Sequence, residues 1–557
     1  MPTAVEMQKQ KDRALQVIKT YERLSGDRGN WESHWQEIAQ RIWPNQSHLF
    51  TSNGILTAQG EKRTEYLFDS TASLSLNKFG AILDSLLTPM NQIWHKLAPT
   101  DPYLLKDRET VLWFEDLNRL LFKQRYAPMS NFISQNQLVY KMLGAYGSGC
   151  NFIDDLRVAG NRKDGLRYRS CHLSEIFFQE NHQGIVDSVI RRFRMTARQI
   201  MQVWAESAPA EVKNAMKEKP EQEFLILHCV QPNGEYDPKR KDDKGKAYSS
   251  HYVIIEGQAM LDESGYSVFP YAISRYEQVP GEVYGRSPAM DVLPSIKTLN
   301  EEKKTMLNQG HRAVAPVLLA HDDGVLDTFS LRPGAINYGG VNEDGKPLVH
   351  ALPVGNLAVG RDMMEDERSD IKEAFLVPLF QMLEDNPQMT ATEVVERVKD
   401  RGMLTAPTIG RQYSEYHGPL IEREIAILVA QKKVAPPPRA LVEAKGEYRV
   451  EYESPMSRSQ RAEQVSGLLR NIETCISIST QTQNPEVLDH YNWDVAIPEI
   501  NDIGGVPAKW LNGADQIAAI RQQRAQAIQQ QTAIQAAPGA AALSKADTAA
   551  KQVARGR

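Results

Sequence analysis

The chain has 557 residues, 41% of them hydrophobic and 24% charged, so it is long enough for several domains with a large core. Its formal net charge of -5 excludes a protein whose whole surface grips nucleic acid, but not one that lets DNA pass. The N-terminus lacks an apolar signal core and no apolar run approaches the length needed to cross a bilayer, so no membrane partner is expected. The cysteines form no C-x-x-C pair and are expected to be free thiols in a reducing cytosol: Cys150, Cys171, Cys229 and Cys475.

The first 150 residues are predicted to be mainly helical. Apolar residues recur at helical spacing through residues 1–45, until Pro44 ends the pattern. The same period recurs in three more stretches, 71–87, 110–125 and 131–143. Gly147 and Gly149 then break the last of these helices.

Residues 151–285 show the shorter period of β-strands. Strands are predicted within 168–178, 186–190, 224–230, 251–255 and 271–276. They are accompanied by a turn at 181–184, a helix at 196–204 and a charged surface loop at 239–246. The predicted fold class is therefore α+β, mainly helical.

The centre of the chain is predicted to contain two helices on either side of a small β-rich lobe. The first helix covers about 287–311, and Pro294 either kinks it or marks its true first turn. A turn-rich segment follows up to residue 355, and a second helix returns over 357–383. After a short loop, Thr390 and Glu393 form a capping box that opens a third helix, which continues to about residue 431.

The last fifty residues differ from the rest of the chain. The segment 514–537 is rich in Ala and Gln, and its apolar stripe is thin. Such a helix is stable mainly when it packs on copies of itself or on a neighbour. The tail after Gly539 is expected to be disordered.

One segment has the spacing of a phosphate-binding loop, from Gly340 to Lys346, but its chemistry fails. Pro347 stands where a hydroxyl group would hold magnesium, and it also removes a backbone donor. Glu343 and Asp344 place negative charge where phosphate oxygens would lie. The segment is interpreted as an acidic surface turn between two strands.

Two acidic groups could in principle hold a metal or exchange protons. The run His321–Asp323 has no partner motif and is interpreted as a solvated turn. A second group within a helix is interpreted as a wet helix face: Glu365, Asp366, Glu367 and Asp370. The sequence contains no nucleophile elbow, His-Glu-x-x-His helix or Cys/His cluster, so we expect no catalytic residue, no metal and no cofactor.

Four motifs follow one another between residues 30 and 430. They are Arg63-x-x-x-x-Phe68-Asp69-Ser70-Thr71-Ala72 with Leu86-Leu87-Thr88-Pro89; Tyr284-Gly285-Arg286-Ser287-Pro288-Ala289 with Leu293-Pro294-x-Ile296-Lys297-x-Leu299-Asn300; Ala315-Pro316 with Asp322-Asp323-Gly324; and Met389-Thr390-Ala391-Thr392-Glu393-Val394. In these motifs the chain resembles the portal, or head-to-tail connecting, proteins of T7-like and related podoviruses. The last hundred residues carry no matching motif.

The resemblance implies a portal fold that assembles as a ring, typically of about twelve subunits. It divides the chain into a wing at 1–285 and 391–490, stem helices at 286–311 and 357–383, a clip at 312–356, a channel loop at 384–390, and a crown helix with its tail at 491–557. The resemblance assigns the clip between the two stem helices and the channel loop after the second.

The implied function is that of a virion protein at one capsid vertex, assembled in the host cytoplasm, through which the genome is packaged and ejected. The implied partners are further copies of the chain, double-stranded DNA that passes without sequence specificity, terminase, the major capsid and scaffolding proteins, and tail adaptor proteins.

The charges of the two predicted stem helices suit a conduit. Between 287 and 311 the first carries three basic and three acidic residues, and between 357 and 383 the second carries three basic and six acidic ones. A neutral or acidic lining lets a duplex slide, whereas a basic lining would hold it by counterion release. The candidates for weak contacts with DNA are Lys297, Lys303, Lys304, Arg361, Arg368, Lys372 and, in the channel loop, Asp385, Asn386, Pro387 and Gln388.

Two other functions are open at this point. The chain could be a different virion structural protein, such as a tail adaptor or a scaffold-associated subunit. It could also be a nuclease or ATPase subunit, although the failed phosphate loop counts against this. Rings with a duplex-wide hole would separate the leading hypothesis from the first alternative, and metal- or ATP-dependent activity would identify the second.

Overall fold

The computed structural model of the protein describes residues 4–51, 60–65, 67–156, 164–240, 242–320, 330–353, 357–378, 408–444, 446–452, 455–482, 489–504, 506, 508–513 and 515–531. Within this part the chain forms two compact units. The first contains the chain up to residue 94, residues 120–434 and residues 454–456, and the second contains the remainder. The fold combines helices with antiparallel sheets, so the α+β class is confirmed.

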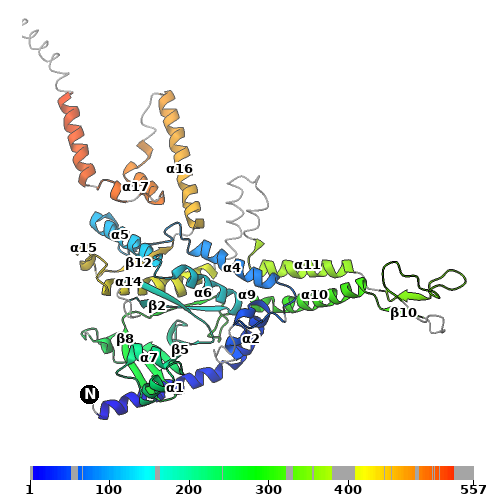
Figure 1. Ribbon diagram of the computed structural model, residues 1–557. Helices are drawn as coiled ribbons and strands as arrows, with labels where there is room; N and C mark the ends of the chain where they lie inside the picture. Colours follow the sequence, from blue (N-terminus) through cyan, green and yellow to red (C-terminus); the bar gives the residue numbers. More distant parts are fainter. Residues whose placement is uncertain are drawn as a thin grey trace, which may run out of the picture. The chain divides into compact units, whose positions relative to one another are not determined.

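The first unit begins with two helices where the sequence predicted one helical stretch. They are α1 (Ala4–Asp27) and α2 (Gly29–Ile42) (Figure 1). The chain changes direction between them because Arg28 is buried. Its guanidinium donates hydrogen bonds to the carbonyl oxygens of Leu173 and Ile176, at 2.8 and 2.6 Å, and lies 3.8 Å from the centre of the Phe177 ring. The short helices η1 (Pro44–Gln46) and α3 (His48–Thr51) follow.

The helical core of this unit is formed by α4 (Thr71–Leu87) and α6 (Phe132–Tyr146). A Cβ atom on Gly144 would lie 2.6 Å from the Phe79 ring, so glycine at this position allows the two helices to approach closely. The predicted span of α4 is confirmed, whereas α6 continues three residues beyond its predicted end. It stops at Gly147, whose φ of 78° is left-handed.

The first unit also contains two antiparallel sheets, and the three-stranded one packs against α6. The three-stranded sheet has the order β3 (Leu166–Cys171), β2 (Ser148–Asp155), β9 (Tyr271–Arg275). The five-stranded sheet has the order β4 (Ile176–Glu180), β5 (Val186–Thr196), β6 (Glu223–Pro232), β7 (Tyr248–Ile254), β8 (Ala259–Tyr266). Cys150 lies directly opposite Cys171 between β2 and β3, and both are free thiols, as are Cys229 and Cys475.

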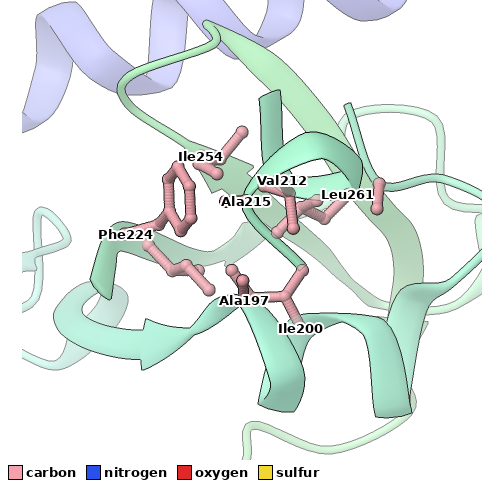
Figure 2. Packing of buried hydrophobic residues seen from close by; sticks show 9 residues of the cluster. Ala197, Ile200, Val212, Ala215, Phe224, Ile254 and Leu261 are labelled. Atoms are coloured by element: carbon pink, nitrogen blue, oxygen red, sulfur yellow. The ribbon is translucent and has the colours of Figure 1, made fainter. Parts of the chain in front are cut away.

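Both faces of the five-stranded sheet are covered by helices. Ile226 of β6 packs with residues of α7 (Ala197–Trp204) and α8 (Ala210–Glu218) in the cluster of Figure 2. The next residue, Leu227, packs against α1. Since successive side chains of a strand point to opposite faces, α1 lies on the face opposite to α7 and α8. The sequence predicted α7 but neither α8 nor β8.

A π-helical segment, Gln412–His417, continues into α14 (Gly418–Ala430), and both pack against the three-stranded sheet. Its Glu415 accepts hydrogen bonds from Arg275 of β9, at 2.8 and 3.0 Å. In α14, Glu424 pairs with Arg125 at 2.9 Å, and both side chains are fully buried. Tyr168 donates a further hydrogen bond to Glu424, so this buried carboxylate has more than one donor.

The second unit contains the end of the chain. A two-stranded sheet joins β1 (His95–Pro99) to β12 (Tyr448–Tyr452), and the N-terminal part of α5 (Arg108–Arg125) lies in the same unit. The other elements are η2 (Leu104–Lys106), α15 (Arg439–Glu443), α16 (Pro455–Thr482), α17 (Trp493–Ile503) and η6 (Ala508–Trp510). The predicted C-terminal helix is confirmed over 515–531, where every described residue is exposed, and the rest of that prediction lies outside the described residues.

Candidate functional site

Two long helices leave the body of the first unit side by side (Figure 1). They are α10 (Leu293–Val314) and α11 (Leu357–Ala374). The 22 residues of α10 span about 33 Å. The short helix α9 (Pro288–Asp291) precedes α10, and Pro294 lies in the first turn of α10. Of the two predicted roles for Pro294, the marker of a helix start is therefore the one confirmed.

The helical pair, α10 and α11, is antiparallel and packs through small and flexible side chains. A Cβ atom on Gly360 would lie 2.6 Å from the Met306 sulfur, so the backbone of α11 lies directly against this methionine. Leu299 on α10 and Ile371 on α11 are buried nearer to the body of the unit. The two helices are thus tightly packed near the body of the unit, and further out the Met306 side chain fills the space between them.

The helix predicted to reach residue 383 ends at Ala374. Leu376 has a φ of 58°, and its N–H bonds to the carbonyl of Glu373 at 2.9 Å. The N–H of Val377 bonds to the carbonyl of Lys372 at 3.0 Å, which completes a Schellman-type end. Phe375 and Val377 are buried, and their burial holds a leucine in a conformation that usually needs glycine.

The segment 379–407 lies outside the described residues. It contains the predicted channel loop with Asp385, Asn386, Pro387 and Gln388, and also the predicted capping box at Thr390. The run His321–Asp323 lies outside them as well. These predictions are neither confirmed nor contradicted.

A joint of three residues fixes the helical pair to the body of the unit: Asn300 of α10, Arg368 of α11, and Asp69 just before α4. The Asn300 side chain accepts hydrogen bonds from the backbone N–H groups of Phe68 and Asp69, at 3.0 and 3.2 Å. Its amide nitrogen donates to the carbonyl of Ile296 at 3.0 Å. Arg368 donates to the Asp69 carboxylate at 2.7 Å. One segment of backbone therefore holds both helices.

The Asp69 carboxylate is ionised at this joint. Burial opposes its charge, but hydrogen bonds from Thr71 and Arg368 outweigh the burial and lower the pKa of Asp69. Its other oxygen accepts the backbone N–H of Thr71 at 2.9 Å. The same carboxylate thus caps the start of α4 and anchors α11.

Beyond the joint, two carboxylates approach each other across the helical pair. Glu302 of α10 and Glu367 of α11 each have one buried oxygen without a hydrogen-bond partner among the described residues. Burial, and then the charge of Glu367, raise the pKa of Glu302. When both carboxylates are ionised, their repulsion therefore destabilises the packing of α10 against α11.

The segment between the two helices has no core of its own. The strands β10 (Leu318–Ala320) and β11 (Val349–Ala351) form a two-stranded sheet within the lobe, which we define as residues 315–320 and 330–353. No described residue from 301 to 353 is buried. The lobe instead exposes large apolar side chains, among them Val317, Leu319, Leu331, Ile336, Tyr338, Val341 and Leu352.

The segment from Gly340 to Lys346, which has the spacing but not the chemistry of a phosphate-binding loop, lies in this lobe. Val341 pairs with Pro347 across a turn in which Asn342 bonds to the carbonyl of Lys346 at 2.9 Å. Gly345 has a φ of 77° in that turn. The segment from Val341 to Pro347 is exposed throughout, so the predicted surface turn is confirmed, but it is flanked by an isolated β-bridge and not by two strands.

The six cations predicted on the helical pair have different surroundings. Lys297 pairs with Glu37 of α2 at 2.7 Å, and Arg368 belongs to the joint. Lys304 lies 5.8 Å from the centre of the Phe68 ring. Lys372 is 3.6 Å from Glu365, Arg361 is 79% exposed, and Lys303 has no ion pair among the described residues.

The sequence interpretation missed the structural role of Arg368 and did not single out Asn300 as an anchor. The motif that contains Phe68 and Asp69 could have indicated this attachment, because Asn300 and Arg368 bind these two residues. The predicted wet face is confirmed for Glu365, Asp366 and Asp370, which are exposed, but not for Glu367, which faces Glu302.

Neither a metal cluster nor a membrane-spanning helix was found in the described residues. No group of three or more His, Cys, Asp or Glu side chains there could hold a metal ion. In the same residues, no helix is both long and apolar enough to cross a membrane.

Comparison with known proteins gives one family and two full-length relatives. A family model described as bacteriophage head to tail connecting protein matches residues 14–511. The probable portal protein of Bordetella phage BPP-1 is 28% identical over 558 residues, covering 98% of this chain and 96% of that protein. The portal protein of Salmonella phage epsilon15 is 28% identical over 547 residues, covering 96% and 95%.

Loss of the joint is expected to loosen the helical pair. Replacing Asp69 or Arg368 by alanine breaks the same contact, so the two losses of stability should not add. We expect a coupling of about 0.5–3 kcal/mol in a double-mutant cycle measured by urea unfolding. Hydrogen exchange should rise in α10 and α11 in both variants. Ser369→Ala, at an exposed position of the same helix, should change neither measurement, and simple additivity would contradict the pairing.

The facing carboxylates predict a pH effect with a definite sign. The raised pKa of Glu302 means that the folded state binds its proton more readily, so this group favours folding as the pH falls through that pKa and loses this effect above it. Glu302→Gln should therefore be more stable than the parent chain in urea at pH 7, and the difference should shrink toward pH 4.5. The matched control is Glu301→Gln, which removes the carboxylate of the exposed neighbouring residue; the stability gain of Glu302→Gln at pH 7 should exceed that of this control.

Proposed function

The chain belongs to the family of bacteriophage head to tail connecting proteins, and from that premise we propose that it forms a ring at one vertex of a phage capsid. The genome enters the capsid through this ring during packaging and leaves through it during ejection. Both full-length relatives are named as portal proteins, which supports this assignment.

The observation that carries the proposal is the absence of buried residues from 301 to 353 in the described chain. A lobe without a core cannot offset its loss of chain entropy by burying its own apolar surface. Exposed apolar patches of this kind mark contacts with other proteins. Further copies of the chain supply such contacts when they are arranged in a closed ring.

The parts of the portal fold follow from this arrangement. We assign the stem to α10 and α11, the clip to the lobe between them, and the wing to residues 1–285 and 391–490. The crown is assigned to the C-terminal residues from 491. In this assignment the joint of Asn300, Arg368 and Asp69 connects the stem to the wing.

The stem suits a passage for DNA that must not be held. The helix α11 carries three basic and six acidic residues, so it offers few cations for counterion release. DNA would pass without sequence recognition, because contacts with the phosphate backbone carry no sequence information. The remaining proposed partners are terminase at the clip, the major capsid and scaffolding proteins, and tail adaptor proteins. Assembly in the host cytoplasm is part of the proposal.

Ring formation is the first test. We expect the purified chain to form rings with a hole that admits a duplex, seen by negative-stain microscopy and sedimentation. Replacing Leu331, Ile336 and Tyr338 by serine should lower the ring fraction about tenfold or more, because each buries apolar surface only in the assembly. A matched triple on exposed apolar residues elsewhere, Ile185, Val203 and Tyr236, should assemble normally. A parent chain that stays single at every concentration would contradict the proposal.

The predicted channel loop gives a second test, on the DNA itself. We propose that residues 384–390 face the bore and touch the passing duplex. Deleting Asp385–Gln388 should leave ring assembly intact but reduce the length of DNA retained in filled capsids, measured by gel analysis of packaged genomes. Full packaging with normal retention would remove the loop from the mechanism and leave the ring in place.

A further inference from the structure

The helical pair has two broad flanks, one on each side of the plane that contains both helices. The contact of Met306 with Gly360 defines the line along which α10 and α11 meet. Asn300 and Arg368 both reach the segment 68–69, so they mark the same flank. The opposite flank points away from that segment. Residues can be assigned to the flanks by their helical spacing from these markers.

The flank marked by Arg368 is basic. Arg361 and Lys372 lie seven residues before and four residues after Arg368, and so share its side of α11. Lys303 lies three residues after Asn300 on α10 and joins the same flank. We call Lys303, Arg361, Arg368 and Lys372 the basic face. Glu365 is the one acidic residue of α11 among them, and Arg368 is already occupied by Asp69.

The opposite flank of α11 is acidic. Asp362, Asp366, Asp370 and Glu373 recur at intervals of three or four residues, and we call them the acidic face. All four are exposed. No described ion pair involves Asp366, Asp370 or Glu373, and Asp362 has only its neighbour Arg361 at 4.0 Å. Like charges at this spacing repel one another along a helix, so the acidic face is unfavourable in a single copy.

In a ring of identical subunits, each contact joins two different surfaces of the chain. When the plane of the helical pair lies along the radius of the ring, one flank faces the copy before it and the other flank faces the copy after it. The two flanks here carry opposite charge. Opposed faces of this kind attract and also fix which surfaces meet.

We propose that the acidic face of one subunit packs against the basic face of the next, with Asp366 and Asp370 facing Arg361 and Lys372 of the neighbouring copy. The proposal rests on the proposed ring and names the surfaces that close it. It moves Arg361 and Lys372 from the lining of the bore to the boundary between subunits. The carboxylates that repel one another in one copy are then balanced by cations of the next.

Charge reversal tests the contact directly. The first variant carries Asp366→Lys and Asp370→Lys, and the second carries Arg361→Glu and Lys372→Glu. Each places like charges at every subunit boundary, so neither should form rings alone. In an equal mixture, each boundary between the two variants again joins opposite charges. The mixture should therefore form rings in which the variants alternate, with an even number of subunits, measured by mass photometry and negative-stain microscopy.

Rescue by mixing also shows that both variants fold, since an unfolded chain could not contribute half of a ring. A control swap of an exposed pair on α1, Arg23→Glu with Asp27→Lys, should assemble alone. Rings from either reversed variant alone, or no rings from the mixture while circular dichroism shows both variants folded, would overturn the proposed contact and leave the ring function standing. Absence of rings from the parent chain would instead remove the ring and this contact with it.

Discussion

The structure depends on how α10 and α11 are attached to the body of the first unit. Both helices contact that body only near one end and then project away from it. After Asn300, α10 has no buried residue, so nothing beyond that point can orient it except α11 and the lobe. The orientation is set at Asp69, whose backbone N–H is held by one helix and whose carboxylate is held by the other. Directional hydrogen bonds to a charged group fix an angle in a way that apolar packing alone does not.

The body of the first unit is built to give that attachment a rigid base. Buried arginines join elements that lie far apart in the sequence. Arg28 connects the turn between α1 and α2 to the loop before β4, Arg275 connects β9 to the π-helical segment, and Arg125 connects α5 to α14. Each buried charge has a carboxylate or carbonyl partner, because an unpaired one would be costly.

Local features of the sequence predicted much of this fold, and tertiary features explain the rest. The span of α4 was predicted because its apolar residues repeat at helical spacing between clear boundaries. The turn at Arg28 was missed because only burial of its side chain produces it. The end of α11 was missed because Leu376 takes a left-handed conformation that the sequence does not announce. The short strand β12 depends on its partner β1, more than three hundred residues earlier, so local periodicity could not reveal it.

The candidate site was predicted in outline but not in its contacts. Counting charged residues gave the net charge of each helix. It could not show that Lys297 forms an ion pair with Glu37, or Arg368 with Asp69. Those partners come from α2 and from the segment before α4.

The lobe of residues 315–320 and 330–353, which has no core, has a further consequence. In the proposed ring the lobe takes its shape from contacts between copies, so a protein that recognises that shape would distinguish a completed ring from single subunits.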